Sequence, residues 1–554
     1  MVRLSPPLRY SPFTLRYCPP AFFLAAVALL ATAPPARSAG QEVPPRWTDE
    51  TPDAMIDDAA ARALAPGAAD HTQLAALAVI VALNDHATRD HAQARLQRIA
   101  ASPTVDRDVQ ADAALLARML SPDEGTEAGR KADRQLGVID AVSVLGPFRD
   151  TGGGIDAHDG PELSNPPFGE GARYSWGSYE VSWREVPPAF ATAEGVPLDL
   201  FVFPRKESCT WVGTHLTISV ARPLTFHAAS AGQLRLVFDG ADLARQETVH
   251  ETARFERVAA RVDADAGEHI LAAKVCSGAL DDEGRVRLRV TDETGGWPDG
   301  VRASARWGDQ PRTILKPAAV HAASTLLVRS LGSEGTVDAR LDAIVLRTLG
   351  GADDQRSPRA SGLVAALADA RPDSDRLAMA AWVTPAGASR SAWLSRALQG
   401  ADGRTRAFIE RRLVERHLQA QLADWAIASL RGAKIDAADD AEAAILSAQV
   451  DLALGTDAMR LVAMRRLTAL DQRTAPRAAL ALLARTAEGL DPAIALSSRE
   501  QLAARGDLGS DRVRVVASSR GRQDAIAAAE RAFEGGVGDA DEAVAVAQTV
   551  AQTG

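Results

Sequence analysis

Two cysteines are the residues of this chain best placed to form a covalent bond with each other. Cys209 and Cys276 both lie in one strand-like stretch and are the only cysteines after the N-terminal segment. An even cysteine pair within one small domain predicts a disulfide in an exported protein, with two buried free thiols as the alternative. The sequence contains no CxxC, HExxH or histidine-rich cluster, so we expect no metal site.

Tryptophans in the same stretch could stack on sugar rings. Trp183 and Trp211 have strand-like neighbours, so we expect them in the core, where tryptophan is a common filler. Trp176 and Trp297 have glycine-rich neighbours and remain candidates for stacking on a ligand. Packing in the core and stacking on a ligand account equally well for these two residues.

Other charged or flexible segments predict no chemistry. Glycines at 152–154 are not followed by Gly-Lys-Ser/Thr, so they predict turns rather than a phosphate loop. Acidic residues at 281–283 could bind calcium, but we expect a solvated turn. We expect solvated helix faces for the arginines at 411, 412, 416, 465 and 466. No catalytic, metal-binding or cofactor-binding residue is therefore predicted.

The N-terminus has the pattern of a signal peptide at residues 1–38. Arg3, Arg9 and Arg16 precede an apolar run at 21–33, which is shorter than the ~20 residues of a membrane-spanning helix. Ala36 and Ser38 suit cleavage after Ser38, with cleavage after Gly40 as the alternative. We predict export to the periplasm or cell surface of a bacterium, with no membrane span after signal removal.

The charge balance disfavours two classes of partner. The 554 residues carry a formal net charge of −10, and the sequence pI is near 5.6. Nucleic acid and anionic membranes both attract basic surfaces, so neither is expected as the main partner.

Residues 136–297 predict an antiparallel β-sandwich. Apolar residues alternate at Leu216, Ile218 and Val220, and the same period recurs at 234–238 and at 286–290. The dipeptide Asp239-Gly240 is a strong hairpin signal.

Helical periodicity flanks the predicted sandwich. We expect a flexible lead-in at 39–53, an N-terminal helical domain at 54–135, a linker at 298–312 and an α-helical repeat region at 313–554. Helices of this length with short breaks suit a tetratricopeptide-like array, although its full residue signature is absent. A plain helical bundle is the alternative. At the C-terminus, the stripe of Val544, Ala547 and Ala551, with Val550 beside it, is expected to pack on Ala525, Ala528 and Phe533 or to meet further chain.

Several motifs together resemble a known family. They are Val-Leu-Gly-Pro-Phe at 144–148, the glycines at 152–154, Tyr-Glu-Val-Ser-Trp at 179–183 and Ala-Gly-Glu-His at 266–269 before a strand. This order is similar to the non-catalytic front half of exported bacterial proteins that join helical repeats and a jelly-roll-like, carbohydrate-binding-like sandwich to a transglutaminase-like domain. A papain-type site needs a cysteine at a helix start, and neither Cys209 nor Cys276 has that context. The resemblance therefore implies the fold but no catalytic residue.

These patterns predict an exported, non-catalytic scaffold or binding protein without a cofactor. Its helical-repeat surface would hold a protein or peptide, and the sandwich would serve as a platform. The first alternative is an envelope carbohydrate-binding protein. The second is the truncated front part of a transglutaminase-like enzyme.

Overall fold

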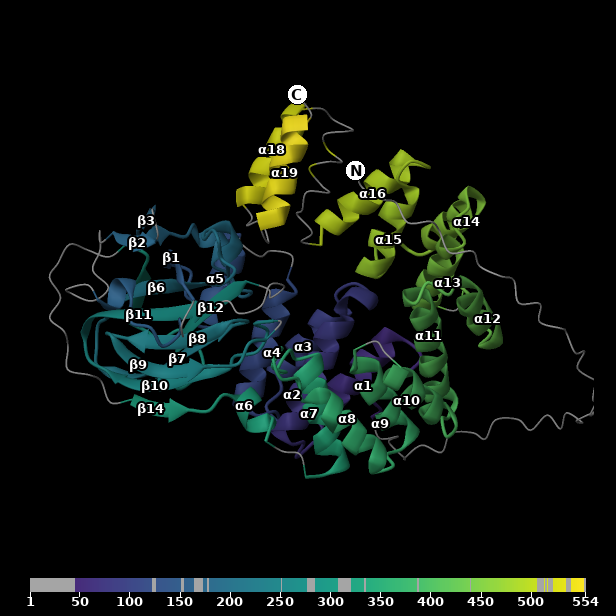
Figure 1. Ribbon diagram of the computed structural model, residues 1–554, viewed down its shortest axis with the longest axis horizontal. Coiled ribbons are helices and arrows are strands. Elements are labelled where there is room, and N and C mark those ends of the chain that lie inside the picture. The colour runs from purple at the N-terminus through teal and green to yellow at the C-terminus, as the bar shows by residue number, and fades with distance from the viewer. Residues whose placement is uncertain are drawn as a thin grey trace, which may run out of the picture. The chain divides into compact units, whose positions relative to one another are not determined.

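The protein combines α-helices with antiparallel β-sheets, as expected (Figure 1). The computed structural model describes residues 45–505, apart from 122–125, 151–153, 164–172, 177–178, 251, 277–283, 307–319, 333–334, 386–387 and 439. Beyond 505 it describes residues 513, 516, 522–534 and 540–552. The predicted signal peptide lies outside the described residues. The chain from Pro45 onward forms one compact unit.

Five helices precede the sheets. They are α1 (Pro52–Leu64), α2 (Asp70–Leu83), α3 (His91–Ala100), α4 (Arg107–Met119) and α5 (Glu127–Gln135). Side chains cap three of their N-termini; Thr51, for example, accepts a hydrogen bond from the backbone N–H of Ala54 at the start of α1. Helix α2 is central to the group, because its Leu74, Leu77 and Ile80 are fully buried.

Two antiparallel sheets pack on each other and enclose a common apolar core. The larger contains β1 (Ser143–Arg149), β4 (Arg184–Glu185), β6 (Ser208–Ile218), β8 (Gln233–Phe238), β9 (Ala241–Gln246), β11 (Gly267–Cys276) and β13 (Val301–Ser304). The smaller contains β5 (Val196–Pro197), β7 (Arg222–Ser230), β10 (Val258–Ala264), β12 (Arg285–Thr291) and β14 (Val320–Ala323). A separate hairpin joins β2 (Tyr174–Trp176) to β3 (Tyr179–Val181).

The sandwich extends beyond its predicted end at residue 297. Strand β13 lies inside the predicted linker and pairs with β6, while β14 lies inside the predicted repeat region and pairs with β10. Both segments are short, and each gains its hydrogen bonds from a strand distant in sequence. Local periodicity could not reveal such pairing.

The predicted alternation determines which side chains enter the sandwich core. Leu216, Ile218, Leu236 and Phe238 are buried between the sheets, as the period of two requires. Val220 was expected on the same face, but it follows the end of β6 and is 63% exposed.

The Asp239-Gly240 hairpin is held by His269. Asp239 and Gly240 both have positive φ, the left-handed conformation that such a turn needs. The Asp239 carboxylate accepts from the backbone N–H of Ile270 at 2.8 Å and lies 2.7 Å from His269 Nδ1. The other ring nitrogen of His269 lies 2.9 Å from the carbonyl of Asp265. Burial lowers the pKa of His269, but these oxygen partners outweigh it and raise the pKa above its ordinary value.

This turn should make stability depend on pH. The folded pKa of His269 lies above that of the unfolded chain, so its stabilisation is complete below about pH 6.5 and is lost as pH rises through the folded pKa. We expect the difference in unfolding free energy between wild type and Asp239→Asn to be largest below pH ~6.5 and to shrink above it. Urea unfolding of both proteins across this range measures the difference. A difference that stays constant or grows with pH would contradict the assignment.

The helices that follow the sheets are arranged in consecutive pairs. The first are α6 (Leu326–Ser330), α7 (Val337–Thr348), α8 (Ala360–Asp369), α9 (Ser374–Val383) and α10 (Ala388–Leu398). The next are α11 (Gly403–Gln419), α12 (Ala423–Gly432), α13 (Ala441–Ala453), α14 (Asp457–Thr468), α15 (Arg477–Ala487) and α16 (Pro492–Ala503). From α9 on, neighbours pack as α9/α10, α11/α12, α13/α14 and α15/α16, and both helices of each pair contact the first helix of the next.

Helices from before and after the sandwich share one apolar core. Ile56 and Leu77 lie in the same cluster as Ile344, Met379 and Phe408. The predicted N-terminal helical domain at 54–135 is therefore not separate from the helices beyond residue 313. The sandwich is inserted between two parts of one helical body, and its Phe255 joins the helical cluster.

The segment just before α1 is bound to helix α9. Trp47 is buried, and the Arg62 guanidinium lies 4.4 Å from the centre of its ring. The backbone N–H groups of Trp47 and Thr48 donate to the Asp375 carboxylate at 3.1 and 2.8 Å. The part of the predicted flexible lead-in that follows Pro45 is thus fixed against α9.

The last two described helices, α18 (Arg522–Glu534) and α19 (Ala540–Gln552), form a hairpin. Val546 and Val550 pack towards Ala525 and Ala528, whereas Val544 is 53% exposed. Packing on Ala525 and Ala528 is therefore confirmed, with Val550 as one of the contacting residues, whereas Phe533 is exposed. The stripe of Val544, Ala547 and Ala551 is wrong in its rotation about the helix, because the buried positions follow the i, i+4 spacing of Val546 and Val550.

None of the helices in the described part of the chain is both long and apolar enough to cross a membrane.

Candidate functional site

The predicted disulfide joins Cys209 on β6 to Cys276 on β11. These residues lie directly opposite each other in the two paired strands, with their Cα atoms 4.0 Å apart, and both are fully buried. Gly154 lies against the bridge, where an added Cβ would come 2.7 Å from the Cys209 sulfur. Because the sulfurs are bonded to each other, they are not free to ligate a metal together with the nearby Asp150.

The outer face of the larger sheet is covered around this bridge. Trp211 is fully buried there, as expected for a core residue, and Trp183 is partly buried in the same cluster. Lys274 lies beside Trp211 and donates from Nζ to the Ala157 carbonyl at 2.6 Å, with an Asp159 carboxylate oxygen 3.3 Å away. A sugar ring cannot reach Trp211 on this covered face.

The two proposed stacking tryptophans are not brought together by any described contact. Trp297 packs partly against the sandwich core, and its Nε1–H donates to the Val301 carbonyl at 3.0 Å, so a structural role accounts for its position. Trp176 ends strand β2, and its side chain lies outside the described residues. The acidic turn at 281–283 also lies outside them.

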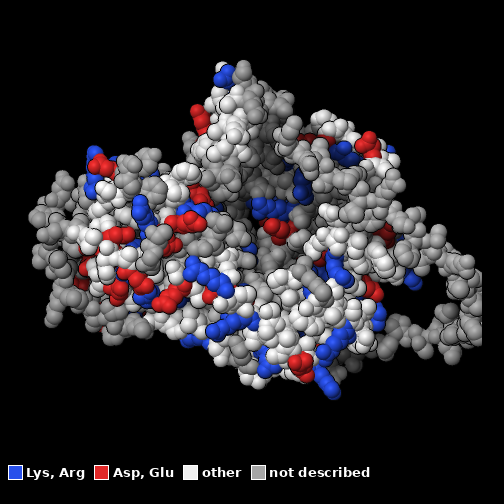
Figure 2. All heavy atoms as spheres, viewed as in Figure 1, with Lys and Arg blue, Asp and Glu red and all other residues white. Residues whose placement is uncertain are grey.

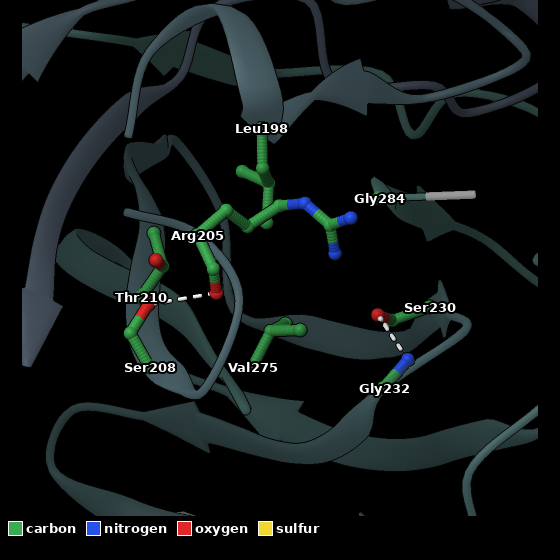
Figure 3. Close-up of a pocket in the computed structure, with 8 residues that line it drawn as sticks. All are labelled: Leu198, Arg205, Ser208, Thr210, Ser230, Gly232, Val275 and Gly284. Carbon is green, nitrogen blue, oxygen red and sulfur yellow. Dashed lines mark hydrogen bonds between the residues drawn. The ribbon is translucent and has the colours of Figure 1, made fainter. Parts of the chain in front are cut away.

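The interior of the sandwich contains a cavity of about 10 Å³ near the bridge (Figure 3). Ser208 and Ser230 line it and are hydrogen-bonded to neighbouring backbone, at 2.8 Å to the Arg205 carbonyl and at 3.2 Å from the Gly232 N–H. This volume accommodates about one water molecule, so it is not a ligand site.

The paired helices carry a buried ionic network that the sequence did not predict. Arg411 and Arg412 were expected on a solvated face of α11, but only 2% and 7% of their surfaces are exposed. Glu442 on α13 pairs with both, at 2.9 Å from Arg411, and Asp440 at the start of α13 lies 2.6 Å from Arg411. Buried guanidinium groups need such partners, and here they come from the next helix pair. The network therefore fixes α11 against α13.

The hairpin of α11 and α12 places one tryptophan in solvent. Gln421 has positive φ and ends the turn after α11, while the backbone N–H of Leu422 donates to the His417 carbonyl at 2.8 Å. Helix α12 then begins, and Trp425 in its first turn is 64% exposed beside Leu422, which is 44% exposed. We call Leu422, Trp425 and His417 the Trp425 surface.

The histidine of the Trp425 surface has a lowered tendency to carry a proton. His417 lies with its ring centre 6.1 Å from that of Trp425, and its Nδ1 is 3.0 Å from the Ser429 hydroxyl. Burial and then the charge of Arg416 lower the pKa of His417 below its ordinary value. The Trp425 surface therefore combines two exposed apolar side chains with an imidazole whose neutral form is favoured.

Charged residues are interspersed on the face of the molecule drawn in Figure 2. Lysine and arginine alternate there with aspartate and glutamate, so this face has no continuous basic stripe among its described residues.

Comparisons with protein-family models, with curated proteins and with solved structures find no match for this chain.

Proposed function

We propose that the chain is an exported, non-catalytic binding protein that presents its paired helices to a protein or peptide partner. The observation that carries this proposal is Trp425, a large aromatic side chain that is 64% exposed. Its helix, α12, is packed against α11 and α13, because Ala426 is buried with Val414 and Leu446. Tryptophan is enriched among the residues that dominate binding energy at protein interfaces. The partner would bury an apolar side chain against Trp425 and Leu422.

Three further features support the proposal. Pairs of helices from α9 to α16 suit a tetratricopeptide-like array, whose repeats bind partners along one surface. The Arg411–Glu442 network fixes α11, on which α12 and its Trp425 pack, and rigid surfaces lose less entropy on binding. The buried disulfide and the predicted signal peptide are compatible with the periplasm or cell surface.

Site-specific photocrosslinking in the native cell envelope tests this proposal. A photoreactive amino acid would replace Trp425, and the matched control would carry it at Val220, which is 63% exposed on the sandwich. We expect a discrete crosslinked protein at position 425 that is absent at 220. The partner must then bind the purified protein, and Trp425→Ala should weaken the complex by about thirtyfold, the effect of losing a dominant interface residue.

Two outcomes would contradict the proposal. The crosslinks at 425 could match those at 220, or the purified partner could bind Trp425→Ala as tightly as wild type. Because the indole is mostly exposed, the substitution should leave thermal unfolding unchanged, so loss of binding cannot be attributed to misfolding.

A further inference from the structure

A cavity of about 470 Å³ lies between the outer face of the smaller sheet and helices α4 and α6. Both helices lie beside the sheets in Figure 1, and Arg329 of α6 donates to Asp108 of α4 at 2.7 Å. The volume is within the range of small-molecule sites, about 300–1,000 Å³. We call this space the sheet–helix cavity; its polar lining comes mainly from β7, β10, β12 and α4.

The sheet side of the cavity is a closed ionic network. Glu256 is buried, and its two carboxylate oxygens lie 2.7 Å from an Arg289 nitrogen and 2.9 Å from His227 Nδ1. His227 Nε2 lies 3.0 Å from the Thr291 hydroxyl. Burial raises the pKa of Glu256, but Arg289, His227 and Arg287 more than reverse it, so this pKa lies well below its ordinary value. Glu256 is therefore ionised, and its negative charge is already paired with Arg289 and His227.

The helix side differs because two of its charged groups have no oppositely charged partner among the described residues. Asp112 on α4 lines the cavity and is half-buried, yet it makes no hydrogen bond or ion pair with any residue that the structure describes. Arg107 lies five residues before Asp112, at the start of α4. It donates to the Glu293 carbonyl at 2.8 Å but pairs with no described carboxylate.

The remaining charges of the lining are already satisfied. Arg261 pairs with Glu293 at 2.9 Å, Arg329 pairs with Asp108, and Asp292 accepts two hydrogen bonds from Thr294. One carboxylate and one guanidinium on the same helix are thus left facing a space of ligand size.

We propose that the sheet–helix cavity binds a small zwitterion, an amino acid or a short peptide, whose ammonium group pairs with Asp112 and whose carboxylate pairs with Arg107. An ammonium group is compact and donates three hydrogen bonds, which suits a single recessed carboxylate. A guanidinium at the rim suits a carboxylate, which it can bind with two parallel hydrogen bonds. The hydroxyl groups of Thr225, Thr291 and Thr325 can hydrogen-bond the rest of the ligand.

The charges around Asp112 predict that binding depends on pH. Burial, followed by repulsion from Glu256, raises the pKa of Asp112 to about 7, while Arg289 and Arg287 act in the opposite direction and Asp108 adds a smaller repulsion. An ammonium group binds the ionised carboxylate. Affinity should therefore fall about tenfold for each pH unit below that pKa, and binding there should release a proton.

The test uses the purified exported protein and defined probes. Thermal unfolding is measured with free amino acids, dipeptides, glucose and N-acetylglucosamine, and calorimetry then gives the affinity of the best zwitterion. We expect a zwitterion to raise the unfolding temperature, and its N-acetylated form, which lacks the ammonium charge, to have no effect. Asp112→Asn should weaken binding at least about tenfold and remove its pH dependence, and Arg107→Gln should weaken it by a smaller factor.

A matched control separates loss of the site from loss of the fold. Asp90→Asn changes an exposed aspartate at the start of α3, outside the cavity lining, and should leave binding unchanged. The proposal is wrong if no zwitterion binds, or if Asp112→Asn binds as tightly as Asp90→Asn. It is also wrong if only the sugars bind, since the cavity would then belong to an uncharged polyhydroxy ligand.

Discussion

Glu442→Gln is expected to lower the free energy of unfolding by about 3 kcal/mol, because it leaves two buried guanidinium groups short of one negative charge. Glu442 is 5% exposed and pairs with both Arg411 and Arg412. Asp440 continues to compensate Arg411, so the loss should fall at the lower end of the range for breaking a buried pair. Urea unfolding followed by circular dichroism measures it.

Glu415→Gln is the matched control for this experiment. Glu415 pairs with the same Arg412 at 2.8 Å, but within one helix and from a side chain that is 21% exposed. We expect a loss of about 0.5 kcal/mol, as for other pairs one turn apart. Equal losses in the two variants would mean that the network does not hold α11 to α13.

Replacing both Cys209 and Cys276 with alanine is expected to lower the free energy of unfolding by about 4 kcal/mol. The bridge joins residues with a sequence separation of 67. Without it the unfolded chain gains conformational entropy, and for a loop of this length the chain-entropy relation gives a loss of stability of about this size. Urea unfolding of the double variant and of oxidised wild type measures the difference. Unfolding wild type in the presence of a reductant should give the same loss.

The chemical state of the cysteines provides an independent check. Both residues are fully buried in paired strands, so alkylation is done after denaturation without a reductant. We expect no alkylated thiol at either position in the purified wild-type protein. Two alkylated thiols, or an unchanged stability of the alanine variant, would contradict the role given to this bridge.

The features predicted correctly are those with a local period or a local pair. Alternation at Leu234, Leu236 and Phe238 fixes which side chains enter the sandwich core, and Asp239-Gly240 fixes the turn that follows. The cysteine pair was inferred from number and context, and the strand register places the two residues opposite each other.

The features missed depend on partners far away in the sequence. Arg411 looks solvated on its own helix and becomes buried only because Asp440 and Glu442 lie 29 and 31 residues later on the adjacent helix. Strands β13 and β14 are too short to show a period and exist through their pairing with β6 and β10. Asp112 resembles any other polar residue of an amphipathic helix, and only the fold brings it near Glu256.

The central claim is that this is a binding protein whose helical surface and sheet–helix cavity serve different ligands. The most direct measurement is the dissociation constant of the partner captured at position 425, determined with purified wild type, Trp425→Ala and Asp112→Asn. We predict that Trp425→Ala weakens the complex by about thirtyfold and that Asp112→Asn leaves it unchanged. Equal affinity of wild type and Trp425→Ala would contradict the claim.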